Sequence, residues 1–312
     1  MPVAIPASVA HVFDRVLAED PDREALVTRT ARCTYAELDR LADRAAHALA
    51  GLGVGPGDRI GASLPNEIDV VAAFHGAMRL GAVWVGVNRA FAPPEKAFIL
   101  DDAGASLFLV DEPVPGVAPR TVLLDEWQAA MTAADEGPRR AAVDPLAPAG
   151  IAYTSGTTGH PKGAVHSQRN LLVPGAVLVE SRGYGPDLRK GDCLPLTILN
   201  MMVLTTLLVA QAGGTCIVMD RLDPEGVADW IRDHRVTTWN GPPALLHGLA
   251  TNDAVRPEDL AGLDEVWTGG ADCPAAIQQQ FEAKFGHPVL ATYGLSEAPT
   301  VVTIDPRGGP HV

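Results

Sequence analysis

The hydrophobic and polar positions in the first part of the chain change repeatedly between helical and strand periodicity. Apolar residues at helical spacing predict a helix over 9–18, and a short apolar run predicts a strand over 25–28. Thr34 and Glu37 have the spacing of a capping box, and the glycine-rich run 51–57 ends the helix that they open. The elements expected next are a strand over 59–64, a helix over 67–80, a strand over 82–87, a helix over 95–100 and a strand over 107–110. This alternation predicts an α/β fold with a parallel, doubly wound sheet.

The second half of the chain continues this alternation after a less regular connection. We expect 113–148 to be a surface connection with a short helix over 126–134, because it is rich in alanine, proline and charge. A helix is expected over 166–179, interrupted or kinked at Pro174. Further expected elements are helices over 200–212 and 224–234 and strands over 215–219, 236–239 and 263–268, with one more strand from 289.

Residues 193–219 carry no charged side chain, and the length of this segment alone would admit a membrane helix. Pro195, Asn200, Gln211 and the Gly213-Gly214 pair divide the segment into shorter pieces. A buried helix that leads into a central strand is therefore the better interpretation.

Composition and charge narrow the class of protein. A chain of 312 residues with 47% hydrophobic residues can bury a large core, so it is a folded protein rather than a disordered one. The net charge of −14 argues against nucleic acid or an anionic membrane as the main partner, although a local basic pocket for ATP remains compatible with it. The four cysteines are scattered, which suggests neither a zinc site nor a disulfide framework. These thiols and an N-terminus without the parts of a signal peptide lead us to expect a cytoplasmic protein.

The most informative stretch for chemistry runs from 151 to 164 and combines hydroxyls, glycines and Lys162. Glycines let consecutive backbone N–H groups turn toward one centre, and the lysine adds a point charge for a phosphate group. An ordinary surface loop is the alternative, but Pro161 stiffens the turn before Lys162, which a flexible linker does not need. The spacing excludes a Walker A loop, because Lys162 follows Pro161 and precedes Gly163.

Two further turns follow predicted strands. Gly269 and Gly270 come at the carboxyl end of one strand, and Pro274 opens the next helix, so a flat ring could approach the backbone there. A plain strand-to-helix turn is the alternative. The stretch from Tyr293 to Glu297 places an aromatic ring, a glycine, a hydroxyl and a carboxylate at the end of another strand. On its own, Glu297 would be read as a solvated side chain.

Together these motifs resemble those of the adenylate-forming superfamily, which contains acyl-CoA synthetases, peptide-synthetase adenylation domains and luciferases. The segment 153–163 is similar to the family's phosphate loop, 269–274 to its adenine-side loop, and 293–297 to its Tyr-Gly-x-Thr-Glu motif with Ser296 in place of threonine. The segments 34–38 and 79–84 are similar to elements that are structural in the family. The resemblance implies two stacked, mostly parallel sheets with helices on both faces. It also implies a first α/β subdomain over 1–180 and a second over 181–312.

The resemblance also implies the site residues. Tyr293 and Gly294 would meet the adenine, Ser296 the α-phosphate, and Glu297 would bind Mg²⁺, for which a carboxylate is a suitable ligand. Lys162, Thr158 and Glu297 are the implied catalytic residues. The full set implied to bind the nucleotide is Thr154, Ser155, Gly156, Thr157, Thr158, Gly159, Lys162, Gly269, Gly270, Ala271, Thr292, Tyr293, Gly294, Leu295 and Ser296.

The implied reaction is the activation of a carboxylic acid by ATP to an acyl-adenylate, followed by thioester formation with coenzyme A. Because 193–219 corresponds to the acyl region of the family and holds no carboxylate to pair a substrate ammonium, an apolar fatty or aryl acid is the expected substrate. This charge argument makes a peptide-synthetase domain a weaker alternative, whereas a luciferase stays open. Acyl-CoA synthetases commonly carry an aromatic residue and a histidine after the Pro-Leu of this region, where this chain has Thr197 and Ile198.

The family pattern continues past Glu297 with a Thr-Gly-Asp motif, a barrel subdomain, a hinge and a small C-terminal domain with an adenylation lysine. None of these is found in the sequence after Glu297. We therefore expect this chain to be the N-terminal part of an acyl-CoA ligase, which binds ATP and the acyl group but is catalytically incomplete. The alternative is a short protein that binds a nucleotide or acyl ligand without catalysis.

Overall fold

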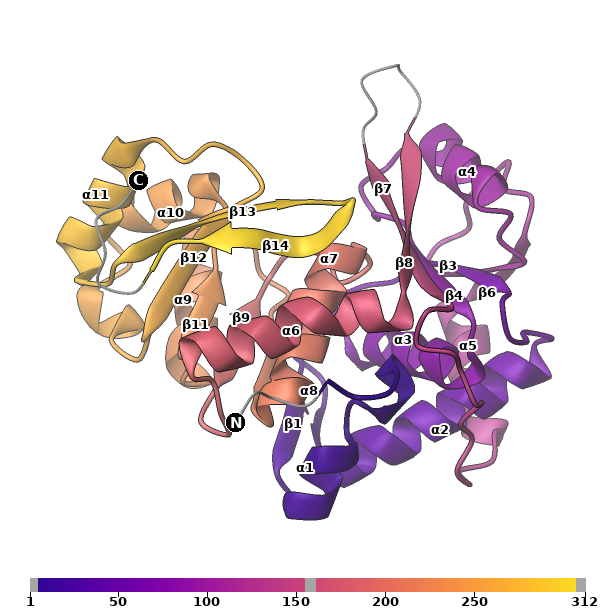
Figure 1. The fold of residues 1–312 in the computed structure, drawn as a ribbon. Helices are drawn as coiled ribbons and strands as arrows, with labels where there is room; N and C mark the ends of the chain where they lie inside the picture. Colours follow the sequence, from indigo (N-terminus) through magenta and orange to yellow (C-terminus); the bar gives the residue numbers. More distant parts are fainter. Residues whose placement is uncertain (1–4, 155–160, 307–312) are drawn as a thin grey trace.

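The strands of the protein form two sheets in the computed structural model, which describes residues 5–154 and 161–306. In chain order the strands are β1 (Glu24–Val27), β2 (Arg32–Thr34), β3 (Arg59–Ser63), β4 (Val83–Gly86), β5 (Leu107–Val110), β6 (Arg120–Leu123), β7 (Pro148–Thr154), β8 (Lys162–Ser167), β9 (Arg189–Asp192), β10 (Thr215–Val218), β11 (Thr238–Asn240), β12 (Glu265–Gly269), β13 (Val289–Leu295) and β14 (Ala298–Ile304). The eight-stranded sheet has the order β14-β13-β12-β11-β9-β10-β1-β2, and the six-stranded sheet has the order β6-β5-β3-β4-β7-β8 (Figure 1).

Most neighbouring strands run parallel, and the antiparallel pairs are β1 with β2, β7 with β8, and β13 with β14. The α-helices are α1 (Asp14–Glu19), α2 (Tyr35–Gly51), α3 (Ile68–Leu80), α4 (Pro93–Asp102), α5 (Leu124–Ala133), α6 (Gln168–Arg182), α7 (Leu199–Met202), α8 (Leu208–Ala212), α9 (Pro224–Asp233), α10 (Pro243–Thr251) and α11 (Ala275–Phe285). Short 3₁₀ helices cover Val9–His11 (η1) and Pro257–Leu260 (η3), and a π-helix covers Val203–Leu207 (η2). Because α6 and α7 each contact both β7 and β14, they lie between the sheets. The predicted fold of two mostly parallel sheets with helices is confirmed.

Several predicted elements lie where local sequence signals placed them. The capping box of α2 is present, since the backbone N–H of Glu37 donates to Thr34 Oγ1 at 3.2 Å and the N–H of Thr34 donates to Glu37 Oε2 at 2.8 Å. The uncharged helix expected over 200–212 is the buried run α7–η2–α8. Within the described ranges, no helix has both the length and the apolar character needed to span a bilayer.

Other elements differ from the predictions. The helix expected over 9–18 is divided into η1 and α1. The connection over 113–148 contains β6, which completes the six-stranded sheet. The helix expected from residue 166 begins at Gln168, because His166 and Ser167 continue β8 in its pairing with β7. The strand β7 was not predicted as a strand. The strands β2, β8, β9 and β14 were not predicted either. Their polar or exposed residues do not give the apolar pattern by which buried strands are found.

The eight-stranded sheet contains strands from both the first and the second half of the chain. The N-terminal strand β1 pairs with β10, with Leu26 opposite Cys216, so the eight-stranded sheet includes β1 and β2. The division into subdomains at residue 180 stays a prediction.

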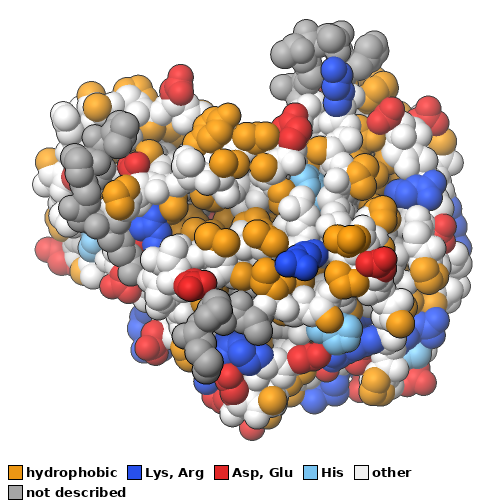
Figure 2. Space-filling model, viewed as in Figure 1, with side chains coloured by type: hydrophobic (Ala, Val, Ile, Leu, Met, Phe, Trp, Pro, Cys, Tyr) orange, Lys and Arg blue, Asp and Glu red, His pale blue; other side chains and the backbone are white. Residues whose placement is uncertain are grey.

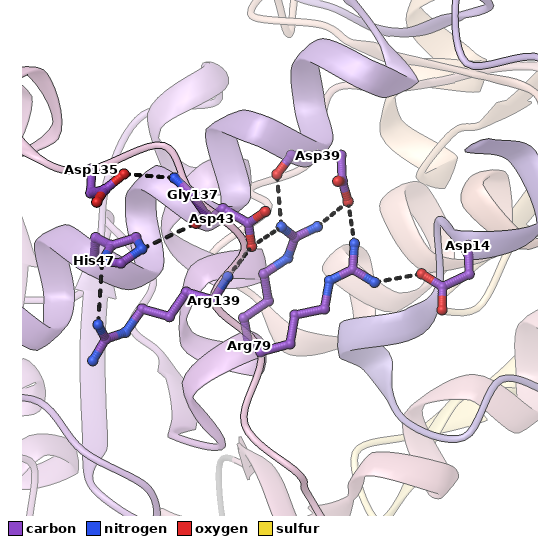
Figure 3. A network of polar contacts seen from close by, with 9 residues as sticks. Asp14, Asp39, Asp43, His47, Arg79, Asp135, Gly137 and Arg139 are labelled. Carbon is purple, nitrogen blue, oxygen red and sulfur yellow. Dashed lines mark hydrogen bonds and ion pairs between the residues drawn. The ribbon is translucent and has the colours of Figure 1, made fainter. Parts of the chain in front are cut away.

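A network of arginines and aspartates ties α2 and α3 to the segment before β7 (Figure 3). The buried Arg79 guanidinium of α3 donates to the Asp39 carbonyl oxygen at 2.7 Å and forms ion pairs with Asp39 and Asp43 of α2. Asp43 also accepts from the backbone N–H of Arg139 at 3.0 Å, and His47 contacts the carbonyl oxygen of Gly137 at 3.1 Å. Arg79 lies only a few residues before β4. The network therefore fixes the position of β4, which is a central strand of the six-stranded sheet.

A second buried ion pair lies in the eight-stranded sheet. Lys190 and Asp192 of β9 are both 0% exposed, and Lys190 Nζ lies 2.7 Å from Asp192 Oδ2. The same carboxylate oxygen accepts from Thr205 Oγ1 of η2 at 2.7 Å, and the lysine lies 5.1 Å from the centre of the Trp267 ring. These contacts explain how a strand with the sequence Arg-Lys-Gly-Asp can be central in a sheet.

Candidate functional site

The adenine-side turn lies directly beside β13. The strands β12 and β13 are parallel neighbours, and Gly269 is opposite Thr292. A Cβ on Gly269 would lie 2.1 Å from Thr292 Oγ1, so only glycine fits there, and this hydroxyl in turn donates to the Thr268 carbonyl oxygen at 2.9 Å. Gly270 follows with φ +78°, a backbone conformation that favours glycine. The two motifs expected to meet the adenine are therefore joined in one surface at the carboxyl ends of adjacent strands.

Tyr293 and Gly294 continue this surface. The Tyr293 side chain is 62% exposed, which leaves a ring face free to meet a flat ligand. Gly294 lies at an irregularity in the pairing of β13 and β14, where an added Cβ would lie 1.5 Å from the Thr300 carbonyl oxygen. Thr300 itself has φ +77°, which is a strained conformation for a β-branched residue. The strand thus bends at Gly294, immediately before the polar turn.

Ser296 and Glu297 form the two-residue turn between β13 and β14, since Leu295 is paired with Ala298. Glu297 is exposed, and it has no hydrogen bond or ion pair within the described part of the chain that would occupy its carboxylate. Ser296 is held from the other sheet, because its carbonyl oxygen lies 2.6 Å from Nε2 of the buried His166 in β8. This contact joins the turn to the strand that begins at Lys162.

The phosphate loop is only partly described. Thr154 ends β7 and Lys162 begins β8, and these two residues are paired across the hairpin. The predicted site residues Ser155, Gly156, Thr157, Thr158 and Gly159 lie outside the described residues. Lys162 is exposed. Next to this pair, the Tyr153 hydroxyl donates to Asp102 Oδ2 at 2.7 Å, and burial together with this bond raises the pKa of Tyr153.

The structure therefore brings the predicted residues together to different degrees. Gly269 at the end of β12 is paired with Thr292, residues 292–295 belong to β13, and Ser296 and Glu297 follow in the turn after that strand. The tip of the β13–β14 hairpin points toward the β7–β8 hairpin, and the molecular surface is hollowed between the two (Figures 1 and 2). His166 is a residue of this region that the sequence analysis missed. The available signal was its place four residues after Lys162.

The donor set suits Mg²⁺ bound together with phosphates better than a metal held by protein alone. No group of three or more metal-binding side chains occurs among the described residues. Mg²⁺ usually keeps several waters and takes one or two carboxylates plus substrate phosphates. The exposed carboxylate of Glu297 fits that role.

The uncharged segment after β9 is buried over η2 and α8, whereas Cys193, Pro195 and Met219 at its two ends line a cavity of about 680 Å³. The side chains of η2 and α8 are buried, and the cavity beside Thr206 and Val209 measures only about 10 Å³. Asp192 is the carboxylate that directly precedes this segment, and its partners are Lys190 and Thr205. The described segment 193–219 itself contains no carboxylate, whereas Glu67, Asp111, Glu112 and Asp220 line the cavity at its ends.

Known proteins match this chain over most of its length. The family model of AMP-binding enzymes matches residues 13–312. The long-chain-fatty-acid–CoA ligase FadD13 of Mycobacterium tuberculosis is 33% identical over 285 residues, which are 86% of this chain and 55% of the relative. Feruloyl-CoA synthase of an Amycolatopsis species is 33% identical over 285 residues, which are 87% of this chain and 56% of the relative. This chain thus spans about half the length of these curated relatives.

A solved structure agrees with this assignment. ATP-bound MatB from Rhodopseudomonas palustris superimposes with a TM-score of 0.87 at 26% identity, and the match covers 97% of this chain and 63% of that one. The resemblance drawn from the three motifs is confirmed by the family match, which includes all of them. The chain belongs to the family of AMP-binding enzymes.

Proposed function

We propose that the protein serves the ATP-dependent activation of an apolar carboxylic acid to an acyl-adenylate, followed by thioester formation with coenzyme A. The observation that carries the proposal is the joining of the two nucleotide motifs. The adenine-side turn at Gly269 and the turn at Ser296 and Glu297 lie at the ends of paired strands, and β8 contacts the second turn. In open α/β sheets, ligands bind at the carboxyl ends of the strands.

The proposed reaction needs positioning and charge more than a protein nucleophile. An oxygen of the substrate carboxylate bonds to the α-phosphorus of ATP, and the bond to the leaving pyrophosphate breaks. The thiolate sulfur of coenzyme A then bonds to the acyl carbon, and AMP leaves. Lys162 and the hydroxyl of Thr158 neutralise and orient the phosphates. Mg²⁺ held by Glu297 would add positive charge beside the phosphates.

The proposed substrate class is a fatty or aryl acid. A charged substrate group needs a buried partner, because an unpaired buried charge costs several kcal/mol. The carboxylate that precedes the uncharged segment is already paired with Lys190. The names of the two curated relatives, a long-chain fatty acid ligase and a feruloyl-CoA synthase, agree with both kinds of apolar acid.

The direct test is Mg·ATP binding by isothermal titration calorimetry, because binding can be measured on the chain itself. Glu297→Gln and Lys162→Met should each weaken Mg·ATP binding about tenfold or more, since each removes a charge-assisted contact of roughly 1.5–3 kcal/mol. Glu258→Gln, which changes an exposed glutamate of η3, is the matched control and should bind like the wild type. Wild-type protein that binds no Mg·ATP would refute the proposal.

The substrate class needs a separate experiment. Stable sulfamoyl-adenosine analogues with a hexadecanoyl, a feruloyl or a lysyl group would compete with Mg·ATP. We expect an apolar analogue to bind more tightly than the lysyl analogue, because the segment 193–219 holds no carboxylate to pair its ammonium. Equal or tighter binding of the lysyl analogue would contradict the apolar substrate while leaving nucleotide binding intact.

A further inference from the structure

We infer that His166 is a positioning residue that holds Ser296 and Glu297 in the geometry in which they meet Mg·ATP. The inference rests on the proposed function, and it assigns a role to a residue outside the three motifs. His166 lies in β8 of the six-stranded sheet, whereas the turn that it contacts closes the last hairpin of the eight-stranded sheet. One buried imidazole therefore connects the two sheets at the candidate site.

The tautomer of His166 follows from its two partners. The carbonyl oxygen of Ser296 can only accept, so Nε2 of His166 carries the proton and donates across 2.6 Å. Nδ1 is then the acceptor, and it receives the amide N–H of Asn170 at 2.9 Å. Asn170 belongs to the first turn of α6, where its backbone N–H donates to the capping Ser167 hydroxyl at 3.1 Å. The imidazole ring of His166 is thus oriented by Asn170 at the start of α6, and its N–H donor, Nε2, bonds to the carbonyl oxygen of Ser296 in the turn.

The turn needs such support. Two-residue hairpin turns are favoured when their first residue has positive φ, because the turn then matches the twist of the strands. Neither Ser296 nor Glu297 has positive φ, since Arg235 and Thr300 are the non-glycine residues with that conformation in the described chain. The neighbouring Thr300 is itself strained at φ +77°. The local sequence therefore does not specify this turn by itself, and an external hydrogen bond can select its geometry.

Burial makes the bond from His166 effective. The His166 side chain is 1% exposed, so water does not compete for Nε2, and the ring has little freedom to turn. The contact fixes a backbone oxygen between Leu295 and Glu297, which leaves the Ser296 hydroxyl and the Glu297 carboxylate free for a ligand. The function of His166 is therefore to prepare these groups before Mg·ATP binds, without contacting the ligand.

The positioning role is tested with two variants, His166→Asn and His166→Gln, whose amide side chains differ in length. In His166→Asn the amide can still meet Asn170 but is too short to reach Ser296, whereas in His166→Gln a donor remains near the position of Nε2. We expect His166→Asn to bind Mg·ATP about two- to tenfold more weakly, the range expected for the loss of one hydrogen bond, and His166→Gln to recover most of the affinity. Adenosine affinity, measured by ligand-observed NMR, should stay unchanged because adenine meets 269–271 and 292–294.

His47→Asn is the matched control, because His47 also contacts a backbone carbonyl oxygen, that of Gly137 at 3.1 Å, but in the network of α2. It should leave Mg·ATP binding unchanged. Unchanged Mg·ATP binding by His166→Asn, or an equal loss of adenosine and Mg·ATP affinity in both His166 variants, would overturn the positioning role. If the wild type binds adenosine but no Mg·ATP, the proposed function fails, and the inference fails with it.

Discussion

Removal of the Lys190 ammonium from the core should cost more stability than any exposed ion pair can contribute. In Lys190→Met, Asp192 keeps its bond from Thr205 but loses the cation with which it pairs, and both members of the pair are 0% exposed in the wild type. Breaking a buried pair in this way costs about 3–5 kcal/mol. That is a large part of the roughly 5–15 kcal/mol by which folded proteins are stable.

The double variant separates charge from packing. In Lys190→Met/Asp192→Asn no net charge is buried, and the asparagine oxygen can still accept from Thr205. We expect the loss in the double variant to be smaller than the sum of the two single losses by about 2 kcal/mol or more. The assay is urea unfolding followed by tryptophan fluorescence, for which Trp267 beside Lys190 is a suitable probe.

The outcome that refutes this reasoning is additivity. If the double variant loses the sum of the single losses to within about 0.5 kcal/mol, Lys190 and Asp192 are not coupled. Glu19→Gln is the control for an exposed pair, because Glu19 and its partner Arg15 are both about half exposed on α1. It should cost no more than about 0.5 kcal/mol.

Three further predictions concern the rest of the fold. Arg79→Met should cost about 3–5 kcal/mol in urea unfolding, because it leaves the buried Asp43 without its cation. Burial lowers the pKa of His75 from 6.5 to about 3, so below pH 6.5 only the unfolded chain takes up this proton. Between pH 6.5 and about 3, wild-type stability should therefore fall by up to about 1.4 kcal/mol per pH unit more than that of His75→Gln; parallel pH profiles would contradict this. Gly294→Ala should weaken Mg·ATP binding, because its Cβ would lie 1.5 Å from the Thr300 carbonyl oxygen; wild-type affinity would refute the close packing.

The parts of the fold that could be predicted from sequence are those specified by neighbouring residues. Thr34 and Glu37 specify the start of α2 within four positions, and the helix begins there. The motif spacing placed Gly269 at the carboxyl end of a strand and Glu297 after one, and Gly269 is the last residue of β12 while Glu297 lies in the turn that follows β13. These signals are local, so they can be read without knowing the partner strands.

The missed features depend on contacts between distant residues. The strand β9 consists of charged residues and glycine. Lys190 is compatible with the core because it pairs with Asp192 and lies beside the Trp267 ring, while Thr205 donates to the same aspartate. His166 and Ser296 are 130 positions apart, so no spacing rule connects them. The roles of the individual site residues stay predictions for the same reason: ligand contacts between distant loops are not encoded in a local pattern.

The pairing of β1 with β10 has a consequence for synthesis on the ribosome. Leu26 of β1 is opposite Cys216 of β10, so the chain must grow by about 190 residues before the parallel partner of β1 exists. At a synthesis rate of about 5–20 residues per second, β1 waits roughly 10–40 s for that partner. During this time the apolar Ala-Leu-Val of β1 is available to other chains and to chaperones. Completion of the eight-stranded sheet is therefore a late event, and the nascent N-terminus needs protection until it occurs.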